Sequence, residues 1–97
     1  MRIVWSPLAL DRAGEIAGYI ARESVASARN WVDSVFTAVK RLRRFPNSGR
    51  AVPEIQRLNI RESIHGPYRV IYRIERARIA ILTIRHGKQD LLPSDFE

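Results

Sequence analysis

The chain has 97 residues and a hydrophobic fraction of 45%, which suits one folded domain with one core. It contains no cysteine, so a disulfide framework and a thiolate metal site are excluded. Its 17 lysine and arginine residues outnumber 10 acidic residues, giving a net charge of +7. This excess favours an anionic partner, either nucleic acid or an acidic protein segment.

The distribution of apolar residues argues against a membrane or secreted protein. No apolar run approaches the roughly 20 residues that a bilayer-spanning helix needs. Residues 1–7 also lack the apolar stretch and cleavage site of a signal peptide. We therefore expect a single domain over residues 1–97, in the cytoplasm and without membrane contact.

The N-terminal part of the chain predicts a strand followed by a helix. Residues 2–5 form a short apolar run, and Ser6-Pro7 is typical of a helix start. A helix is expected over residues 7–22, because apolar residues recur there at helical spacing. This alanine-rich stripe consists of Ala9, Ala13, Ile16, Ala17 and Ile20. The polar residues off the stripe are expected in solvent: Asp11, Arg12 and Glu15.

A second helix is predicted after a short break at residues 23–27, which carries serines suited to cap it. Its apolar stripe is the most regular in the chain: Ala28, Trp31, Val32, Val35, Phe36, Val39 and Leu42. Three arginines crowd its last turn, where cations meet the negative end of the helix dipole, and Pro46 ends it. The two helices should form an antiparallel hairpin. We expect Trp31 and Phe36 in the core rather than on a base-stacking platform.

The last third predicts three strands, because β-branched and aromatic residues dominate its apolar runs. The runs cover residues 60–64, 68–74 and 79–85. In the middle run, one face should carry Tyr68, Val70, Tyr72 and Ile74, and the solvent face Arg69 and Arg73. The third run is apolar on both faces, as an inner strand would be. Residues 50–58 and the tail 89–97 show no clear element.

These elements predict an α+β fold in the order strand, helical hairpin, three-stranded antiparallel meander. The hairpin should cover the apolar face of the sheet, and the N-terminal strand should join one edge. The opposite face should carry arginines and face solvent.

The sequence lacks a glycine-rich phosphate loop, a nucleophile elbow and a His/Asp/Glu cluster at metal spacing. Both histidines, His65 and His86, precede a glycine, and each can be a plain turn residue. His86 is the better catalytic candidate, because it ends the inner strand beside Arg85 and Lys88. We expect no metal, no cofactor and no small-molecule substrate.

Several motifs together resemble the RelE/ParE toxin family across nearly the whole chain. They are Trp5-Ser6-Pro7, Phe45-Pro46-Asn47-Ser48-Gly49-Arg50 with Val52-Pro53-Glu54, Arg61-Glu62, Tyr68-Arg69-Val70-Ile71-Tyr72-Arg73 and His86-Gly87-Lys88. The resemblance implies the toxin of a type II toxin–antitoxin pair, held inactive by a cognate antitoxin. Such antitoxins wrap an often acidic segment around the toxin, which suits a +7 partner.

The resemblance leaves two targets open, since ParE-like members inhibit DNA gyrase and RelE-like members cleave messenger RNA on the ribosome. RelE-like toxins resemble one another in a basic cluster on the sheet, and Arg69 of this chain matches one arginine of that cluster. Two lysine positions fall roughly at Arg57 and Asn59, and a later arginine at Gln89, so the cluster is depleted. We therefore favour gyrase inhibition without enzymatic activity. In the nuclease alternative, Arg69 and His86 would be catalytic.

The residues expected to contact the target or the antitoxin are Arg61, Arg69, Arg73, Arg85 and Lys88. A third hypothesis is a basic nucleic-acid-binding domain without toxicity. The partners expected for a toxin are therefore its antitoxin and either gyrase or the ribosome.

Overall fold

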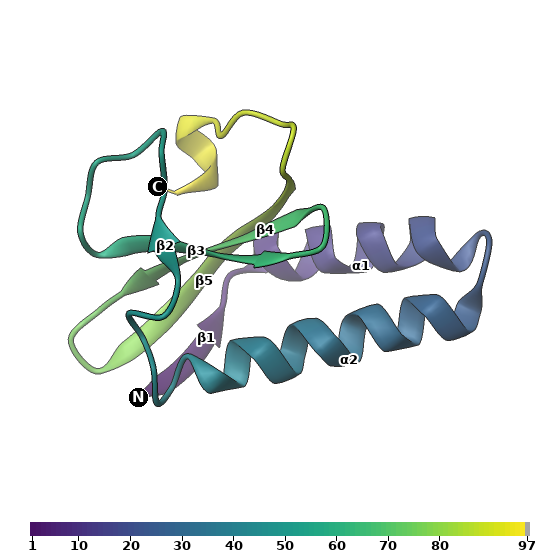
Figure 1. Cartoon of the computed structure of the whole chain (residues 1–97), viewed down its shortest axis with the longest axis horizontal. Coiled ribbons are helices and arrows are strands. Elements are labelled where there is room, and N and C mark those ends of the chain that lie inside the picture. Colours follow the sequence, from purple (N-terminus) through teal and green to yellow (C-terminus); the bar gives the residue numbers. More distant parts are fainter. Residues whose placement is uncertain (97) are drawn as a thin grey trace.

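Two antiparallel helices pack against a five-stranded sheet in the computed structural model, which describes residues 1–96 (Figure 1). The elements are β1 (Arg2–Trp5), α1 (Pro7–Ala21), α2 (Val25–Arg41), β2 (Arg50–Ala51), β3 (Ile60–His65), β4 (Tyr68–Ile74), β5 (Arg78–His86) and the short 3-10 helix η1 (Pro93–Asp95). The α+β class and the predicted element order are confirmed. None of the helices in residues 1–96 is long and apolar enough to cross a membrane.

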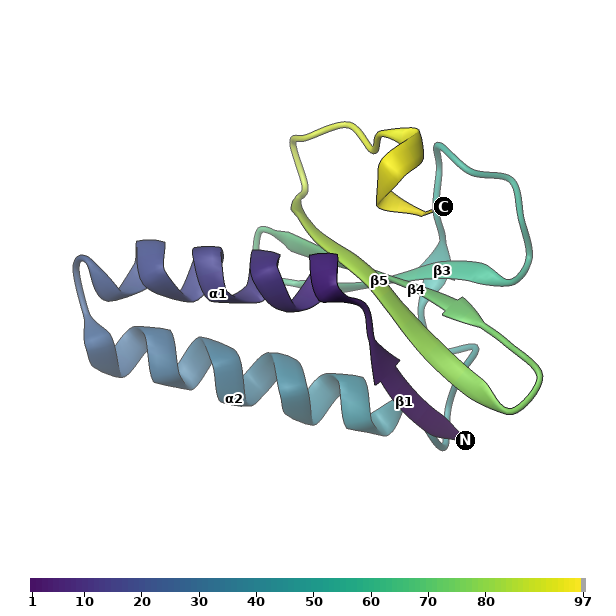
Figure 2. The ribbon, with the colours of Figure 1, turned by 180° about the vertical axis from the view of Figure 1, so that it is seen from behind.

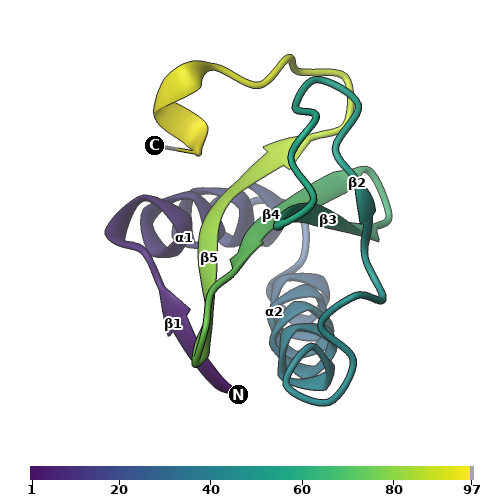
Figure 3. The same cartoon turned by 90° about the vertical axis from the view of Figure 1, so that its left-hand side faces the viewer.

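The strand order in the sheet is β1-β5-β4-β3-β2. β3, β4 and β5 form the predicted antiparallel meander, and β1 joins the edge parallel to β5. β5 is therefore an inner strand, as its continuous apolar run predicted. β1 lies at the margin of the sheet (Figure 3). The prediction missed β2, which pairs with β3 through only two residues.

Both helices begin at the capping residues that the sequence suggested. The Oγ atom of Ser6 accepts a hydrogen bond from the amide of Ala9, and the Oγ atom of Ser24 accepts one from Ser27. Because Ser24 is the cap, α2 already starts at Val25, and the break between the helices is shorter than expected.

The main core lies between the hairpin and one face of the sheet. Its buried members are Ala9, Ala13, Val35, Val39, Leu42, Val70, Tyr72, Ile79, Ile81 and Ile84. The small alanines let α1 lie close to β5. Only the near half of the hairpin covers the sheet, and its connecting turn extends well beyond it (Figure 2).

The other face of the sheet is not the solvent-exposed face that we expected. A second buried cluster covers it, made of Val52, Ile55, Ile60, Ile71 and Leu82, with Leu91 and Phe96 packed against it. The 50–58 connection and the C-terminal tail supply the cover. Their apolar residues are too irregularly spaced to reveal this role in the sequence.

The prediction that Phe36 lies in the core is also wrong, because its side chain is exposed. It is 37% exposed and stacks on Trp5 with ring centroids 4.6 Å apart. Consecutive helical residues are about 100° apart, so Phe36 lies at the margin of the helix face that Val35 and Val39 bury. Trp31 is half-buried and packs against the core.

Candidate functional site

Arg69, the strongest candidate for a functional cation, is buried and ion-paired. Its Nε atom donates to Glu62 at 2.7 Å, and its Nη1 and Nη2 atoms each donate to Glu54 at 2.8 Å. The Arg69 side chain is 7% exposed and that of Glu62 is fully buried. The prediction of a solvent-facing Arg69 is therefore wrong, because the 50–58 connection brings Glu54 over the sheet.

The ion pairs of this cluster favour the charged forms of Glu54 and Arg69. Hydrogen bonds from Arg69 lower the pKa of Glu54 from 4.5 to about 2, although burial opposes the shift. The two carboxylates in turn raise the pKa of Arg69 above its usual value. A guanidinium whose donors already bind two carboxylates has little capacity left for a phosphate.

The Asn47-Ser48-Gly49-Arg50 turn is held against this cluster by the buried Tyr72. The Tyr72 hydroxyl donates to the Pro46 carbonyl at 2.7 Å and accepts from the Gly49 amide at 3.0 Å. A Cβ atom on Gly49 would overlap that hydroxyl and the Glu62 carbonyl. Only glycine therefore fits this turn, which explains in physical terms one of the motifs noted in the sequence.

Arg61 and Arg73 also contact groups within the protein. Both side chains are half-buried. Arg61 donates to the Gly49 carbonyl at 2.9 Å, and the Nε atom of Arg73 donates to Glu75 at 2.8 Å. The expectation that Arg73 projects freely from a solvated face is thus only partly correct.

Arg85 is paired with Asp95, a buried residue of the tail that no motif in the sequence indicates. Arg85 contacts Asp95 at 3.1 Å, and Arg12 from α1 pairs with the same carboxylate. Burial alone would raise the pKa of Asp95, but the Leu92 amide and the two guanidinium groups outweigh it and lower that pKa. The prediction that Arg12 is solvated is therefore wrong, and these ion pairs attach the tail to the sheet.

His86 belongs to an aromatic row at the end of β5. Its ring lies 5.7 Å from Tyr68, edge to face, and Tyr68 lies 5.5 Å from Trp31. The Nδ1 atom of His86 accepts a hydrogen bond from the Lys88 amide at 3.1 Å, which favours the proton on Nε2 in the neutral ring. His65 instead contacts Ser63 at 2.9 Å at the end of β3, and burial lowers its pKa.

A surface pocket of about 490 Å³ brings several predicted residues together. Arg69, His86 and Lys88 all line it, beside Glu54 and Tyr68. Lys88 is exposed, and its ammonium has no ion-pair partner within residues 1–96. Arg61 and Arg73 do not line the pocket. The pocket therefore offers Lys88, His86 and the exposed Arg50 to an anion, with Arg69 already neutralised and Asp90 also in the lining.

Comparison with known proteins shows to which family the chain belongs. A sequence model described as "ParE toxin of type II toxin-antitoxin system, parDE" matches residues 3–91. The chain belongs to the ParE toxin family. It is 36% identical over 90 residues to the protein named "Putative toxin Y4kP" of Sinorhizobium fredii (strain NBRC 101917 / NGR234), covering 91% of this chain and 90% of that protein.

A solved structure shares the fold of this ParE toxin. It is titled "Chromosomal ParDE TA system from P. aeruginosa", with a TM-score of 0.74 and 22% identity. The match covers 91% of this chain and 97% of the other. At this identity the likeness concerns the fold.

Four cations without an ion-pair partner gather away from the pocket in this ParE toxin, at the end of α2. Lys40, Arg41, Arg43 and Arg44 are all exposed, and none forms an ion pair with a residue in the described range 1–96. From the sequence, the arginines of this turn were expected only to meet the negative end of the helix dipole. Because Glu54, Glu62, Glu75 and Asp95 pair with arginines elsewhere, this helix end is one of the places where positive charge stays unbalanced.

Proposed function

We propose that this ParE toxin inhibits DNA gyrase by binding it, and that a cognate antitoxin neutralises the toxin. Membership of a toxin–antitoxin family supports an antitoxin partner, and ParE-like members of the resembled family act on gyrase. A cytoplasmic location would follow from this target.

The observation that carries the choice of target is the state of Arg69. Metal-free RNA cleavage needs cations that neutralise the phosphate charge developing in the transition state, and loss of one such stabiliser typically costs about 10²–10³ in rate. Arg69 matches an arginine of the nuclease cluster, yet its donors bind Glu54 and Glu62. Binding-based inhibition makes no such demand and needs only a shaped, charged surface.

The nuclease alternative depends on His86 and Lys88, which line the same pocket. In that case His86 would move the proton of the ribose hydroxyl, and Lys88 would be an exposed cation beside it in the pocket. This alternative and a non-toxic nucleic-acid-binding domain make different predictions in cells.

The proposal can be tested by inducing the toxin with and without the gene that neighbours its own. We expect growth arrest with filamentous, DNA-damaged cells, relieved when the neighbouring gene is co-expressed. Supercoiling and translation should then be measured in parallel in extracts, with the His86→Ala variant as a control that keeps gyrase inhibition. Unaffected growth at high levels of soluble toxin would favour the non-toxic domain, and cleaved messenger RNA that depends on His86 would favour the nuclease.

A further inference from the structure

A second pocket, the α2-end pocket, lies between the C-terminal end of α2, the turn that follows it and β3. It has a volume of about 350 Å³ and shares no lining residue with the pocket around His86. Its lining includes Arg41, Leu42, Phe45, Ser48, Ser63 and His65. This volume lies at the low end of the roughly 300–1,000 Å³ that ligand sites occupy, so it suits a ligand about as large as one nucleotide.

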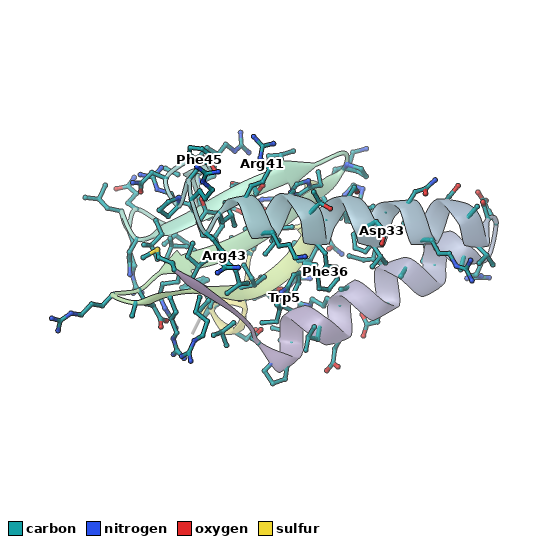
Figure 4. The ribbon with its side chains drawn as sticks, turned by 90° about the horizontal axis from the view of Figure 1, so that it is seen from below. Trp5, Asp33, Phe36, Arg41, Arg43 and Phe45 are labelled. Carbon is teal, nitrogen blue, oxygen red and sulfur yellow. The ribbon has the colours of Figure 1, made fainter. Side chains whose placement is uncertain are left out.

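Phe45 is the aromatic wall of the α2-end pocket. It is 55% exposed, and the Arg44 guanidinium lies over its ring, 5.9 Å from the centroid. Arg44 does not line the pocket, so it leaves the pocket side of the ring open. Figure 4 shows Phe45 and Arg41 together on one side of the end of α2, and Arg43 on the other side. An open ring beside cations is a platform on which an unpaired base can stack.

The turn that follows α2 holds this platform in place. The Phe45 amide donates to the Arg41 carbonyl at 3.0 Å, and the Phe45 carbonyl accepts from the Ser48 amide at 3.0 Å. The buried Tyr72 hydroxyl donates to the next carbonyl, that of Pro46. A ring whose backbone is already ordered loses little conformational freedom when a base stacks on it, so more of the stacking free energy is retained.

The opposite wall of the α2-end pocket supplies hydrogen-bonding groups from β3. Ser63 pairs with Val70 of the main core, so Ser63 and His65 lie on the side of the sheet that the hairpin packs against. The Ser63 hydroxyl lies 2.9 Å from the Nε2 atom of His65. Burial lowers the pKa of His65, so the ring is neutral at pH 7 and acts as a hydrogen-bonding group rather than as a cation. Hydroxyl groups and a neutral imidazole suit the phosphate oxygens and base edges of a nucleotide.

The charge around the α2-end pocket is positive and unbalanced. Arg41 and Arg44 are exposed and form no ion pair within residues 1–96. Arg61, two residues before Ser63 on the same face of β3, donates to the Gly49 carbonyl rather than to a carboxylate. No acidic residue of the described chain lines the pocket. A phosphate would therefore meet cations here that no carboxylate neutralises.

We propose that the α2-end pocket binds an unpaired nucleotide of single-stranded DNA, with the base stacked on Phe45 and the phosphates beside Arg41 and Arg44. The choice of DNA rests on the proposed function, because the proposed target acts on DNA. The toxin would then contact the DNA that gyrase holds as well as the enzyme itself.

Single-stranded DNA fits these features better than the other anionic polymers do. A duplex stacks its bases on one another, so it offers no free base face to Phe45 and only its phosphates to the cations. An acidic peptide such as polyglutamate would use the cations but would leave the stacking platform unused. Both therefore serve as competing probes.

The first test measures binding of the purified toxin to a fluorescein-labelled oligothymidine of about 12 nucleotides. At about 0.1 M salt we expect a dissociation constant in the micromolar range, and at least about fivefold weaker binding of a duplex of the same length. Arg41→Gln with Arg44→Gln removes two cations at the pocket, whereas Lys40→Gln with Arg43→Gln removes the same charge outside its lining. The first pair should weaken binding at least about tenfold and reduce the salt slope by about 1.4, and the second pair should stay within about threefold of the wild type.

The second test asks whether the aromatic ring itself takes part. Phe45→Leu keeps an apolar side chain but removes the π face, so binding should weaken by about 5- to 100-fold, whereas Phe45→Trp should bind at least as tightly as the wild type. Single-stranded DNA should also quench the indole fluorescence that Phe45→Trp adds. Because Phe45 is exposed, neither change should alter the circular dichroism spectrum.

Four results would overturn the inference. They are equal losses for the two pairs of substitutions, wild-type affinity of Phe45→Leu, binding of the duplex as tight as that of the oligothymidine, and tighter binding of an oligouridine or a polyglutamate peptide. The gyrase assay gives a separate answer. A toxin that inhibits gyrase without binding the oligothymidine would overturn this inference alone, and one that binds it through Phe45 without inhibiting gyrase would overturn the proposed function alone.

Discussion

Arg69 is held by two carboxylates, so its removal should act on folding before it acts on function. Arg69→Ala leaves Glu62 buried without its partner, which typically costs about 3–5 kcal/mol. The total stability of a domain of this size is only about 5–15 kcal/mol. We therefore expect a large drop in the urea midpoint of Arg69→Ala, rather than the modest effect that a solvent-facing arginine would have.

A paired substitution separates this structural role from a catalytic one. Arg69→Met combined with Glu62→Leu removes both buried charges and should recover much of the lost stability. Arg69→Ala that unfolds like the wild type but has lost all activity would instead make Arg69 a functional cation.

The Glu54 carboxylate should give the protein a specific acid sensitivity. Its pKa is lowered from 4.5 to about 2 in the folded protein, so it binds protons less readily there than in the unfolded chain. The resulting stability is fully present above about pH 4.5 and is lost as the pH falls toward 2. Glu54→Gln should flatten this part of a plot of unfolding free energy against pH. Glu15→Gln, a change at an exposed residue of α1, should leave the plot unchanged.

Alanine substitutions of Phe36 and Leu42 should lower the stability by very different amounts, although both are apolar residues of the same helical region. Leu42 is 2% exposed, so Leu42→Ala should cost about 2–5 kcal/mol. Phe36 makes an exposed stack with Trp5, and Phe36→Ala should cost only about 1 kcal/mol. Thermal melts followed by circular dichroism measure both. Equal losses would mean that Phe36 belongs to the core after all.

The C-terminal tail depends on one buried carboxylate for its attachment. Asp95 accepts from the Leu92 amide at 2.7 Å and pairs with Arg12 and Arg85. Asp95→Ala should release residues 89–96 from the sheet, because two half-buried arginines lose their partner. Trypsin should then cut after Lys88 at least about tenfold faster than in the wild type. Cleavage at an unchanged rate would show that the apolar contacts of Leu91 and Phe96 suffice to hold the tail.

The elements with strong local signals were predictable from the sequence. Ser6-Pro7 and Ser24 cap the two helices, and the spacing of Val35, Val39 and Leu42 placed the buried face of α2 correctly. These features depend on residues within a turn or two of one another, so pattern and propensity suffice.

The second face of the sheet was not predictable in the same way. Arg69 meets Glu54 across 15 residues, and Arg12 meets Asp95 across 83. Such pairs form only when irregular segments fold over the sheet. The apolar residues of those segments are not periodic, so the sequence does not predict where the segments lie. A solvated arginine and an ion-paired one therefore look identical in the sequence.

In the whole molecule, many arginines are neutralised by carboxylates, whereas the cations at the end of α2 have no ion-pair partner in the described residues. Six arginines pair with four carboxylates, and the residues involved are Arg12, Arg50, Arg69, Arg73, Arg78 and Arg85 with Glu54, Glu62, Glu75 and Asp95. The +7 charge is thus displayed largely elsewhere, including Lys40, Arg41, Arg43 and Arg44. A toxin that acts by binding needs such a surface more than it needs a catalytic centre.

The most direct test of this account is a supercoiling assay with purified DNA gyrase. We predict that added toxin lowers the supercoiling of a relaxed plasmid in proportion to its concentration, and that the protein from the neighbouring gene restores it. His86→Ala toxin should inhibit as strongly as the wild type. Gyrase that works unchanged at saturating toxin, while ribosome-bound messenger RNA is cut by the wild type and spared by His86→Ala, would contradict the account.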